Sequence, residues 1–161
     1  MPKYRALTLE ELQELEKEFV DFLVINGVVA DDWERMKEEQ PESADGILDA
    51  FSDVVFEGIL QQVRFLEVRT SHDIKTFQCL DDKLVLVGLR APQHLPVDFR
   101  DETFLQNALL QPPAELEVYT TEKAYGKERQ VEIFELTEQG CAVTDGKLFK
   151  SLSLALASQQ G

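Results

Sequence analysis

The sequence contains few basic residues and few cysteines. Lys and Arg number 16 against 31 Asp and Glu, which gives a formal net charge of −15 at pH 7. Nucleic acids and anionic lipid surfaces are bound through clustered Lys and Arg, so this charge argues against both as partners. The two cysteines, Cys79 and Cys141, have no metal-ligand spacing, and we expect buried, reduced thiols, although a disulfide between them is compatible with the sequence.

Long apolar runs are also absent. No segment approaches the ~20 consecutive apolar residues of a membrane-spanning helix, and the first residues contain no apolar run of signal-peptide length. We therefore expect a cytoplasmic protein with no membrane partner. The chain has 161 residues, of which 43% are hydrophobic, so it is large enough to bury a core, and we expect a single domain over residues 1–161.

The negative charge is concentrated in the first part of the sequence. Residues 1–62 carry 16 Asp and Glu against 5 Lys and Arg, a net of −11, whereas residues 63–161 carry 15 against 11, a net of −4. The domain is thus divided into an acidic helical part, 1–62, and a mixed part of strands and helices, 63–161. An acidic half favours a basic partner, although most such surfaces only keep a protein in solution.

Three helices are predicted in the acidic part. A capping box that starts at Thr8 begins the first helix, whose apolar side chains follow at helical spacing until Gly27. The second helix is predicted to have Asp31 as its N-cap and Trp33 as its anchor in the core. Pro41 ends this helix and stands at the first turn of the third, where proline is favoured.

The third helix, within residues 40–63, has an acidic face. Asp45, Asp49, Asp53 and Glu57 recur at every fourth residue, so they lie along one side of the helix, where like charges repel one another. The predicted apolar face consists of Ala44, Ile47, Leu48, Phe51, Val54, Val55 and Ile59.

Two apolar residues of this helix, Phe56 and Leu60, fall inside the acidic stripe on a helical wheel. Two arrangements are compatible with this pattern. Either the far end of the helix is covered on both sides, which we expect, or the pair is exposed among carboxylates as a mixed docking face.

Strand-like composition begins after the third helix. Residues 64–70 are rich in β-forming side chains, and residues 74–89 predict an antiparallel hairpin with its turn at Asp81-Asp82. Phe65 and Leu66, near the start of this stretch, are also compatible with an extension of the helix. Residues 115–121 alternate cleanly between apolar and polar side chains and predict another strand.

The rest of the sequence predicts helices. Asp101 is positioned to cap a short helix through Leu109. The spacing of apolar residues at 131–136 does not distinguish a helix from a strand. We predict a helix there because Gly140 supplies a C-terminal stop before a last helix. Helices and strands are segregated along the chain, which predicts an α+β fold: N-terminal helices packed with a small, largely antiparallel sheet and C-terminal helices.

No catalytic or cofactor-binding motif is present. The sharpest enzymatic hypothesis is a divalent-metal site formed by Asp49, Asp53 and Glu57, because carboxylates one turn apart can share a hard cation such as Mg²⁺. The sequence lacks the glycine loop or basic cluster that would bind an anionic substrate beside such a metal. The two histidines, His72 and His94, and the two cysteines lack the paired spacing of zinc sites, so no cofactor is expected.

Five short segments, distributed over most of the chain, are the basis of a family resemblance. They are Leu-Thr-Leu-Glu-Glu-Leu at 7–12, Phe-Val-Asp-Phe-Leu at 19–23, Ala-Asp-Asp-Trp at 30–33, Phe-Ser-Asp-Val-Val-Phe-Glu at 51–57 and Ile-Phe-Glu-Leu-Thr-Glu-Gln-Gly at 133–140. Together they resemble an uncharacterised family of small bacterial proteins. The resemblance implies a bacterial cytoplasmic domain without an assigned function, and it favours the helix at 133–139.

The sequence is best interpreted as a non-enzymatic binding or adaptor protein whose acidic half meets a basic protein partner. No oligomeric state is predicted. The alternative is a divalent-metal-dependent enzyme that uses Asp49, Asp53 and Glu57. The predicted partner-binding residues are Asp45, Asp49, Asp53, Phe56, Glu57 and Leu60.

Overall fold

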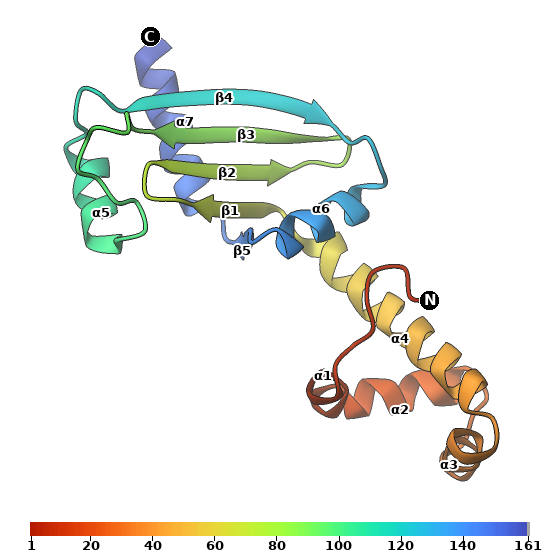
Figure 1. Ribbon diagram of the computed structural model, residues 1–161. Helices are drawn as coiled ribbons and strands as arrows, with labels where there is room; N and C mark the ends of the chain where they lie inside the picture. Colours follow the sequence, from red (N-terminus) through yellow and green to blue (C-terminus); the bar gives the residue numbers. More distant parts are fainter. Residues whose placement is uncertain (161) are drawn as a thin grey trace. The chain divides into compact units, whose positions relative to one another are not determined.

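The computed structural model describes residues 1–160, which divide into two compact units (Figure 1). The helical unit is Met1–Gln61, and the sheet unit begins at Gln62. The boundary lies one residue from the composition change seen in the sequence. Within the described residues, no helix is both long and apolar enough to cross a membrane.

The helical unit contains four helices rather than the predicted three. They are α1 (Leu9–Glu14), α2 (Glu16–Ile25), α3 (Ala30–Glu39) and α4 (Pro41–Gln62), the last of which ends at the boundary between the units. The capping box at Thr8 is present as predicted. The first helix then breaks at Leu15, whose backbone angles of φ −104° and ψ 23° separate α1 from α2. The prediction of one continuous helix was therefore wrong.

The link between α2 and α3 confirms one predicted signal and corrects another. Gly27 has a φ of +77°, and the N–H of Val28 donates to the carbonyl of Leu23 at 2.8 Å, as expected for a glycine stop of the Schellman type. The N-cap of α3 is Val29, without a side-chain capping bond, and not Asp31. Asp31 lies instead in the first turn, where the helix dipole favours a carboxylate.

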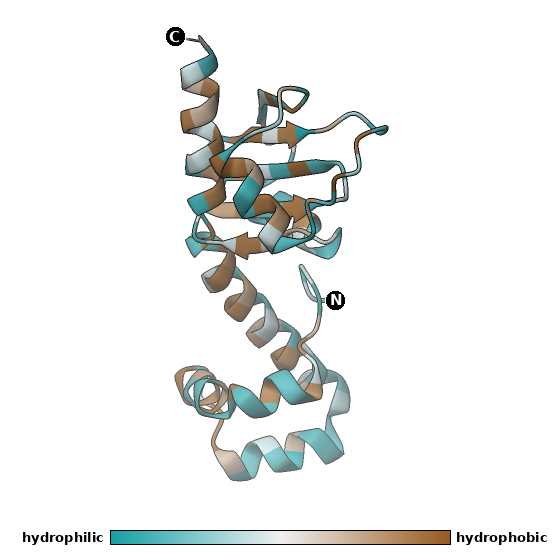
Figure 2. Ribbon diagram, turned by 90° about the vertical axis from the view of Figure 1, so that its left-hand side faces the viewer, coloured by the Kyte–Doolittle hydropathy of each residue, from teal (hydrophilic) through white to brown (hydrophobic). Residues whose placement is uncertain are grey.

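The core of the helical unit is small and aromatic. Leu23, Trp33 and Ala44 are buried together. The Phe19 ring meets Trp33 edge-on, with 5.2 Å between centroids, and it lies 5.0 Å from the ring of Phe51. This geometry is the favoured one for aromatic pairs, and it confirms Trp33 as a core anchor. Hydrophobic residues recur along the whole of α4 (Figure 2).

The sheet unit is built on five antiparallel strands in the order β4-β3-β2-β1-β5. The hairpin of β2 and β3 is confirmed, and Phe65 and Leu66 belong to β1 rather than to the preceding helix. Strand β5 was not predicted. The strands are β1 (Phe65–Arg69), β2 (Asp73–Cys79), β3 (Lys83–Arg90), β4 (Glu117–Ala124) and β5 (Ala142–Thr144).

Three helices complete this unit: α5 (Glu102–Leu110), α6 (Arg129–Glu138) and α7 (Lys147–Gln160). Helix α6 confirms the prediction for residues 131–136, and Asp101 caps α5 through a bond from the N–H of Phe104. Helix α7 runs across one face of the sheet (Figure 1). Ile74, Phe99 and Leu152 belong to the apolar core of this unit. The fold is therefore α+β, as predicted.

Candidate functional site

The predicted apolar face of α4 is buried at Ala44 and Phe51, but not throughout the far end of the helix. Phe56 is 9% exposed and Leu60 is 3% exposed, so both are buried. Val54 and Ile59 were predicted on the buried face, yet they are 57% and 55% exposed. The expectation that Phe56 and Leu60 are covered is therefore confirmed, whereas the expectation of cover on the opposite side is wrong at Val54 and Ile59.

The chain's own first residues cover the acidic side of α4. We call residues 1–7 the N-terminal segment. The backbone N–H of Lys3 donates to Asp53 Oδ1 at 2.8 Å, and its Nζ donates to Glu57 Oε1 at 2.7 Å. The hydroxyl of Tyr4 donates to the same oxygen at 2.5 Å. The repulsion between carboxylates on this helix is thus relieved by a basic segment of the same chain.

The aromatic ring of Phe56 is part of the same contact. The guanidinium carbon of Arg5 stands 4.7 Å from the centroid of this ring, within the range of a cation–π interaction, and the ring of Tyr4 lies 6.1 Å away. Farther along, the N–H of Leu7 donates to Ser52 Oγ at 3.0 Å.

These contacts define the α4 face, which consists of Asp49, Ser52, Asp53, Phe56 and Glu57. Asp49 belongs to it through an ion pair of 3.6 Å with the amine of Met1. Asp45 is exposed, and no hydrogen bond or ion pair is recorded for it in the described part of the chain. Sequence reasoning missed Ser52 and the N-terminal segment. A signal was present, because Lys3 and Arg5 are the only basic residues before Lys17 in an acidic stretch.

The contacts also shift the proton affinities of the groups involved. Hydrogen bonds from Lys3 and then Tyr4 hold the pKa of Glu57 below its usual value. Burial and the bond to Glu57 raise the pKa of Tyr4 to about 12. Near neutral pH, Glu57 therefore accepts as a carboxylate and Tyr4 donates as a phenol, which are the states that the geometry requires.

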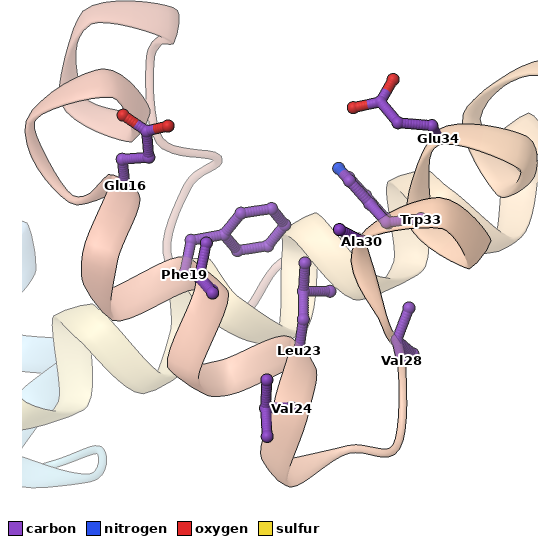
Figure 3. Close-up of a pocket in the computed structure, with 9 residues that line it drawn as sticks. Glu16, Phe19, Leu23, Val24, Val28, Ala30, Trp33 and Glu34 are labelled. Carbon is purple, nitrogen blue, oxygen red and sulfur yellow. The ribbon is translucent and has the colours of Figure 1, made fainter.

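A second feature of the helical unit is an open groove between α2 and α3 (Figure 3). Phe19 and Trp33 point toward one another there, and the carboxylates of Glu16 and Glu34 stand at the edge, one from each helix (Figure 3). The groove encloses about 290 Å³. We call it the α2–α3 groove; its lining residues are Glu16, Phe19, Val20, Leu23, Val24, Val28, Ala30, Trp33 and Glu34.

No metal centre is found in the part of the chain that the structure describes: no group of three or more His, Cys, Asp or Glu side chains is placed to hold an ion. Asp53 and Glu57, two members of the hypothetical metal site, instead accept hydrogen bonds from the N-terminal segment. A cation at these carboxylates would have to displace the ammonium group of Lys3.

The remaining candidate nucleophiles and bases have structural surroundings. Burial raises the pKa of Cys79 to about 11 and raises that of the half-buried Cys141, so neither thiol is activated as a thiolate. The two ring nitrogens of His72 contact Ser71 Oγ and the carbonyl of Leu95, each at 2.9 Å. These contacts fix the imidazole within its loop and account for it without a catalytic role.

The comparisons with known proteins agree with an unassigned role. No curated protein and no solved structure matched the chain. One family model, described as "Family of unknown function (DUF6495)", matches residues 1–157. Because this match covers almost the whole sequence, the chain belongs to that family of unknown function.

Proposed function

We propose that the protein is a non-enzymatic binding or adaptor protein whose helical unit binds a basic, amphipathic segment of another protein. The proposed setting is the cytoplasm of a bacterium, as the sequence resemblance implies. The single observation that carries the proposal is the α2–α3 groove, an apolar depression on the most acidic part of the chain. The metal-dependent alternative has no such feature in its favour.

The floor and walls of the groove suit apolar side chains. Trp33, with 8% exposure, forms the floor, while Val20 and Val24 are 50% and 64% exposed on the wall. Single exposed valines are ordinary on a protein surface. Two of them one helical turn apart, beside an aromatic floor, form a continuous apolar strip of the kind that marks interaction sites.

The negative charge around the groove favours a basic partner. Glu16 is exposed at the edge of the groove, and Glu34 on the opposite helix is ion-paired with Lys37 at 3.1 Å. Residues 1–62 have a net charge of −11, so the surrounding field attracts cations and repels acidic segments. A helix with an apolar stripe flanked by Lys or Arg satisfies both the floor and the edge.

The openness of the groove favours a peptide side chain over a small-molecule substrate. Its volume of about 290 Å³ lies at the lower end of the ~300–1,000 Å³ of ordinary ligand pockets. Such pockets bury most of a bound small molecule, whereas this groove is open to solvent. It can therefore accommodate a few apolar side chains presented by a partner.

Trp33 provides a built-in reporter, because it is the only tryptophan of the chain. The probe is a synthetic amphipathic helix of Leu and Lys with all Leu on one face. We expect its titration into the full-length protein to change the Trp33 emission in a saturable way. Replacing Val20 and Val24 by Ser should raise the Kd about tenfold, the equivalent of two partly lost apolar contacts.

Two controls make this test specific. A peptide of the same composition with shuffled order keeps the charge but loses the apolar face, and it should bind far more weakly. Val54→Ser with Ile59→Ser changes two β-branched apolar side chains that are similarly exposed but lie outside the groove, and it should leave the Kd unchanged. Equal binding of the ordered and shuffled peptides, or indifference to the Val20 and Val24 changes, would overturn the proposal.

A further inference from the structure

We propose that the α4 face is a second recognition surface, which takes a Lys-aromatic-Arg segment of a partner protein, and that the N-terminal segment is a built-in ligand which this partner displaces. The inference rests on the proposed function only in treating the helical unit as a binding unit. It concerns different residues from the α2–α3 groove, so each is tested by its own variants.

The ligand chemistry is defined by what already lies on the α4 face. Three consecutive residues meet three different features: Lys3 bonds Asp53 and Glu57, Tyr4 bonds Glu57, and Arg5 lies over the ring of Phe56. The face therefore contains two carboxylates and an aromatic ring at positions that match one short peptide. A lone cation or an acidic peptide would satisfy only part of this arrangement.

Backbone recognition adds to the side-chain contacts. Asp53 accepts from the backbone N–H of Lys3, and Ser52 accepts from the N–H of Leu7. The hydroxyl of Ser52 in turn donates to the carbonyl of Leu48 at 2.9 Å, which orients its oxygen toward the segment. The surface thus binds the backbone of the segment as well as its side chains, as peptide-binding surfaces do.

The N-terminal segment is held by contacts that can be exchanged. It contains no helix or strand, and Lys3 is exposed. The ion pair of Lys3 with Glu57 leaves both side chains about one-third exposed, at 37% and 31%. Exposed pairs of this kind contribute little and are screened by salt. A tethered segment nevertheless benefits from an effective concentration on the order of millimolar, so it keeps the face closed to weak ligands.

The burial of Phe56 explains why the face is covered when no partner is bound. Tyr4 and Arg5 lie against this ring, so lifting the segment away would expose more apolar surface between Asp53 and Glu57, which is unfavourable in water. A partner with the same Lys-aromatic-Arg pattern restores the bonds to Asp53 and Glu57 and the cation over Phe56, whereas a partner without it does not. The segment therefore protects the face and sets its specificity at the same time.

The test uses the full chain and a peptide with the sequence of residues 1–8, labelled at its C-terminus and with a free N-terminal amine, which keeps the ion pair with Asp49. The receiving protein carries Lys3→Ala, Tyr4→Ala and Arg5→Ala, which weaken the tethered ligand but leave the α4 face intact. We expect this variant to bind the peptide with a Kd about tenfold or more below that of the wild type, because the wild type must first release its own segment.

Added changes on the receiving face locate the binding. Asp53→Asn with Glu57→Gln in the same variant should raise the Kd about tenfold, since the two charge-assisted bonds of Lys3 are weakened. Val20→Ser with Val24→Ser, the groove variant, should not change it. A peptide with Ser in place of Lys, Tyr and Arg should not bind measurably.

Several results would overturn the inference. Equal affinity for the wild type and the variant would show that the segment does not occupy the face as a competitor. Binding that survives the Asp53 and Glu57 changes would place the peptide elsewhere. Dimers of the full chain in sedimentation, lost on Lys3→Ala, would identify a second copy as the occupant. If the triple variant does not fold, Lys3→Ala alone supplies the comparison, and no gain in affinity would count against the proposal.

Discussion

The two units of this chain are stabilised in different ways. In the sheet unit, Ile74 and Phe99 have no exposed surface and belong to an apolar core that α7 helps to form. In the helical unit, the most buried apolar side chain is Phe51 at 2%, and the N-terminal segment is attached through ions and hydrogen bonds. We therefore expect apolar deletions to act most strongly in the sheet unit, and the attachment of the N-terminal segment in the helical unit to respond to pH and salt.

The largest expected effect is the loss of Phe99. This ring is fully buried among the apolar side chains of the sheet unit. Phe99→Ala should lower the free energy of unfolding of this unit by about 3–5 kcal/mol, through lost burial and the cavity left behind. Urea unfolding followed by circular dichroism measures it. Leu110→Ala, at a position 80% exposed, is the matched control and should change stability by less than about 0.5 kcal/mol. A small effect of Phe99→Ala would contradict the inference that the sheet unit is stabilised chiefly by its apolar core.

A smaller effect is expected at Gly88, in strand β3. A Cβ built on this residue would collide with the ring of Tyr119, which packs over the glycine and donates to Asp73 Oδ1 at 2.8 Å. Gly88→Ala should therefore push the ring away and cost about 1–3 kcal/mol. The double variant with Tyr119→Ala should show a much smaller cost for the same glycine change. Full additivity of the two changes would mean that the ring does not decide the residue at position 88.

Local signals in the sequence predicted most of the elements. Thr8 and Asp101 cap helices and Gly27 ends one, because capping bonds and a positive φ depend on a few adjacent residues. The break at Leu15 has no such signal, since leucine favours helices. Strand β5 is three residues long and is defined by its pairing with β1, with Val143 opposite Leu66. A pairing across that much sequence is not visible in local periodicity.

The candidate site was predicted in part for the same reason. Helical spacing gave the acidic stripe and the position of Phe56 within it, because both follow from the geometry of one helix. What covers the stripe depends on contacts between Lys3 and residues 50 and 54 positions away. The α2–α3 groove likewise requires the angle between two helices, which the sequence of neither helix contains.

The three tyrosines provide a spectroscopic test of the contact between Tyr4 and Glu57. The pKa values of Tyr4, in the helical unit, and of Tyr119 and Tyr125, in the sheet unit, are all raised to about 12, chiefly by burial. Glu57→Gln removes the charge that helps raise the pKa of Tyr4. We expect the ultraviolet titration of tyrosinate to show one tyrosine moving part of the way toward 10, with the other two unchanged. Three unchanged tyrosines would contradict the contact of Tyr4 with Glu57.

The direction of the stability effect follows from these shifts. A raised tyrosine pKa stabilises the folded form below the usual value of 10.0, and this contribution is lost as the pH rises toward about 12. The lowered pKa of Glu57 stabilises the folded form above its usual value of 4.5, and this contribution is lost as the pH falls. The N-terminal segment is therefore held most firmly between these limits, and its contact with Glu57 weakens outside them.

The smallest expected effect is that of divalent metals on the helical unit. Asp49, Asp53 and Glu57 recur at the spacing that lets carboxylates share a hard cation, but Lys3 already donates to two of them. We expect Mg²⁺, Mn²⁺ and Ca²⁺ to give no selective rise in the melting temperature. A rise with one metal that disappears in Asp53→Asn with Glu57→Gln would favour the metal-dependent enzyme instead. The ionic contacts of the α4 face would then be the resting state of a metal site, and the segment its competitor.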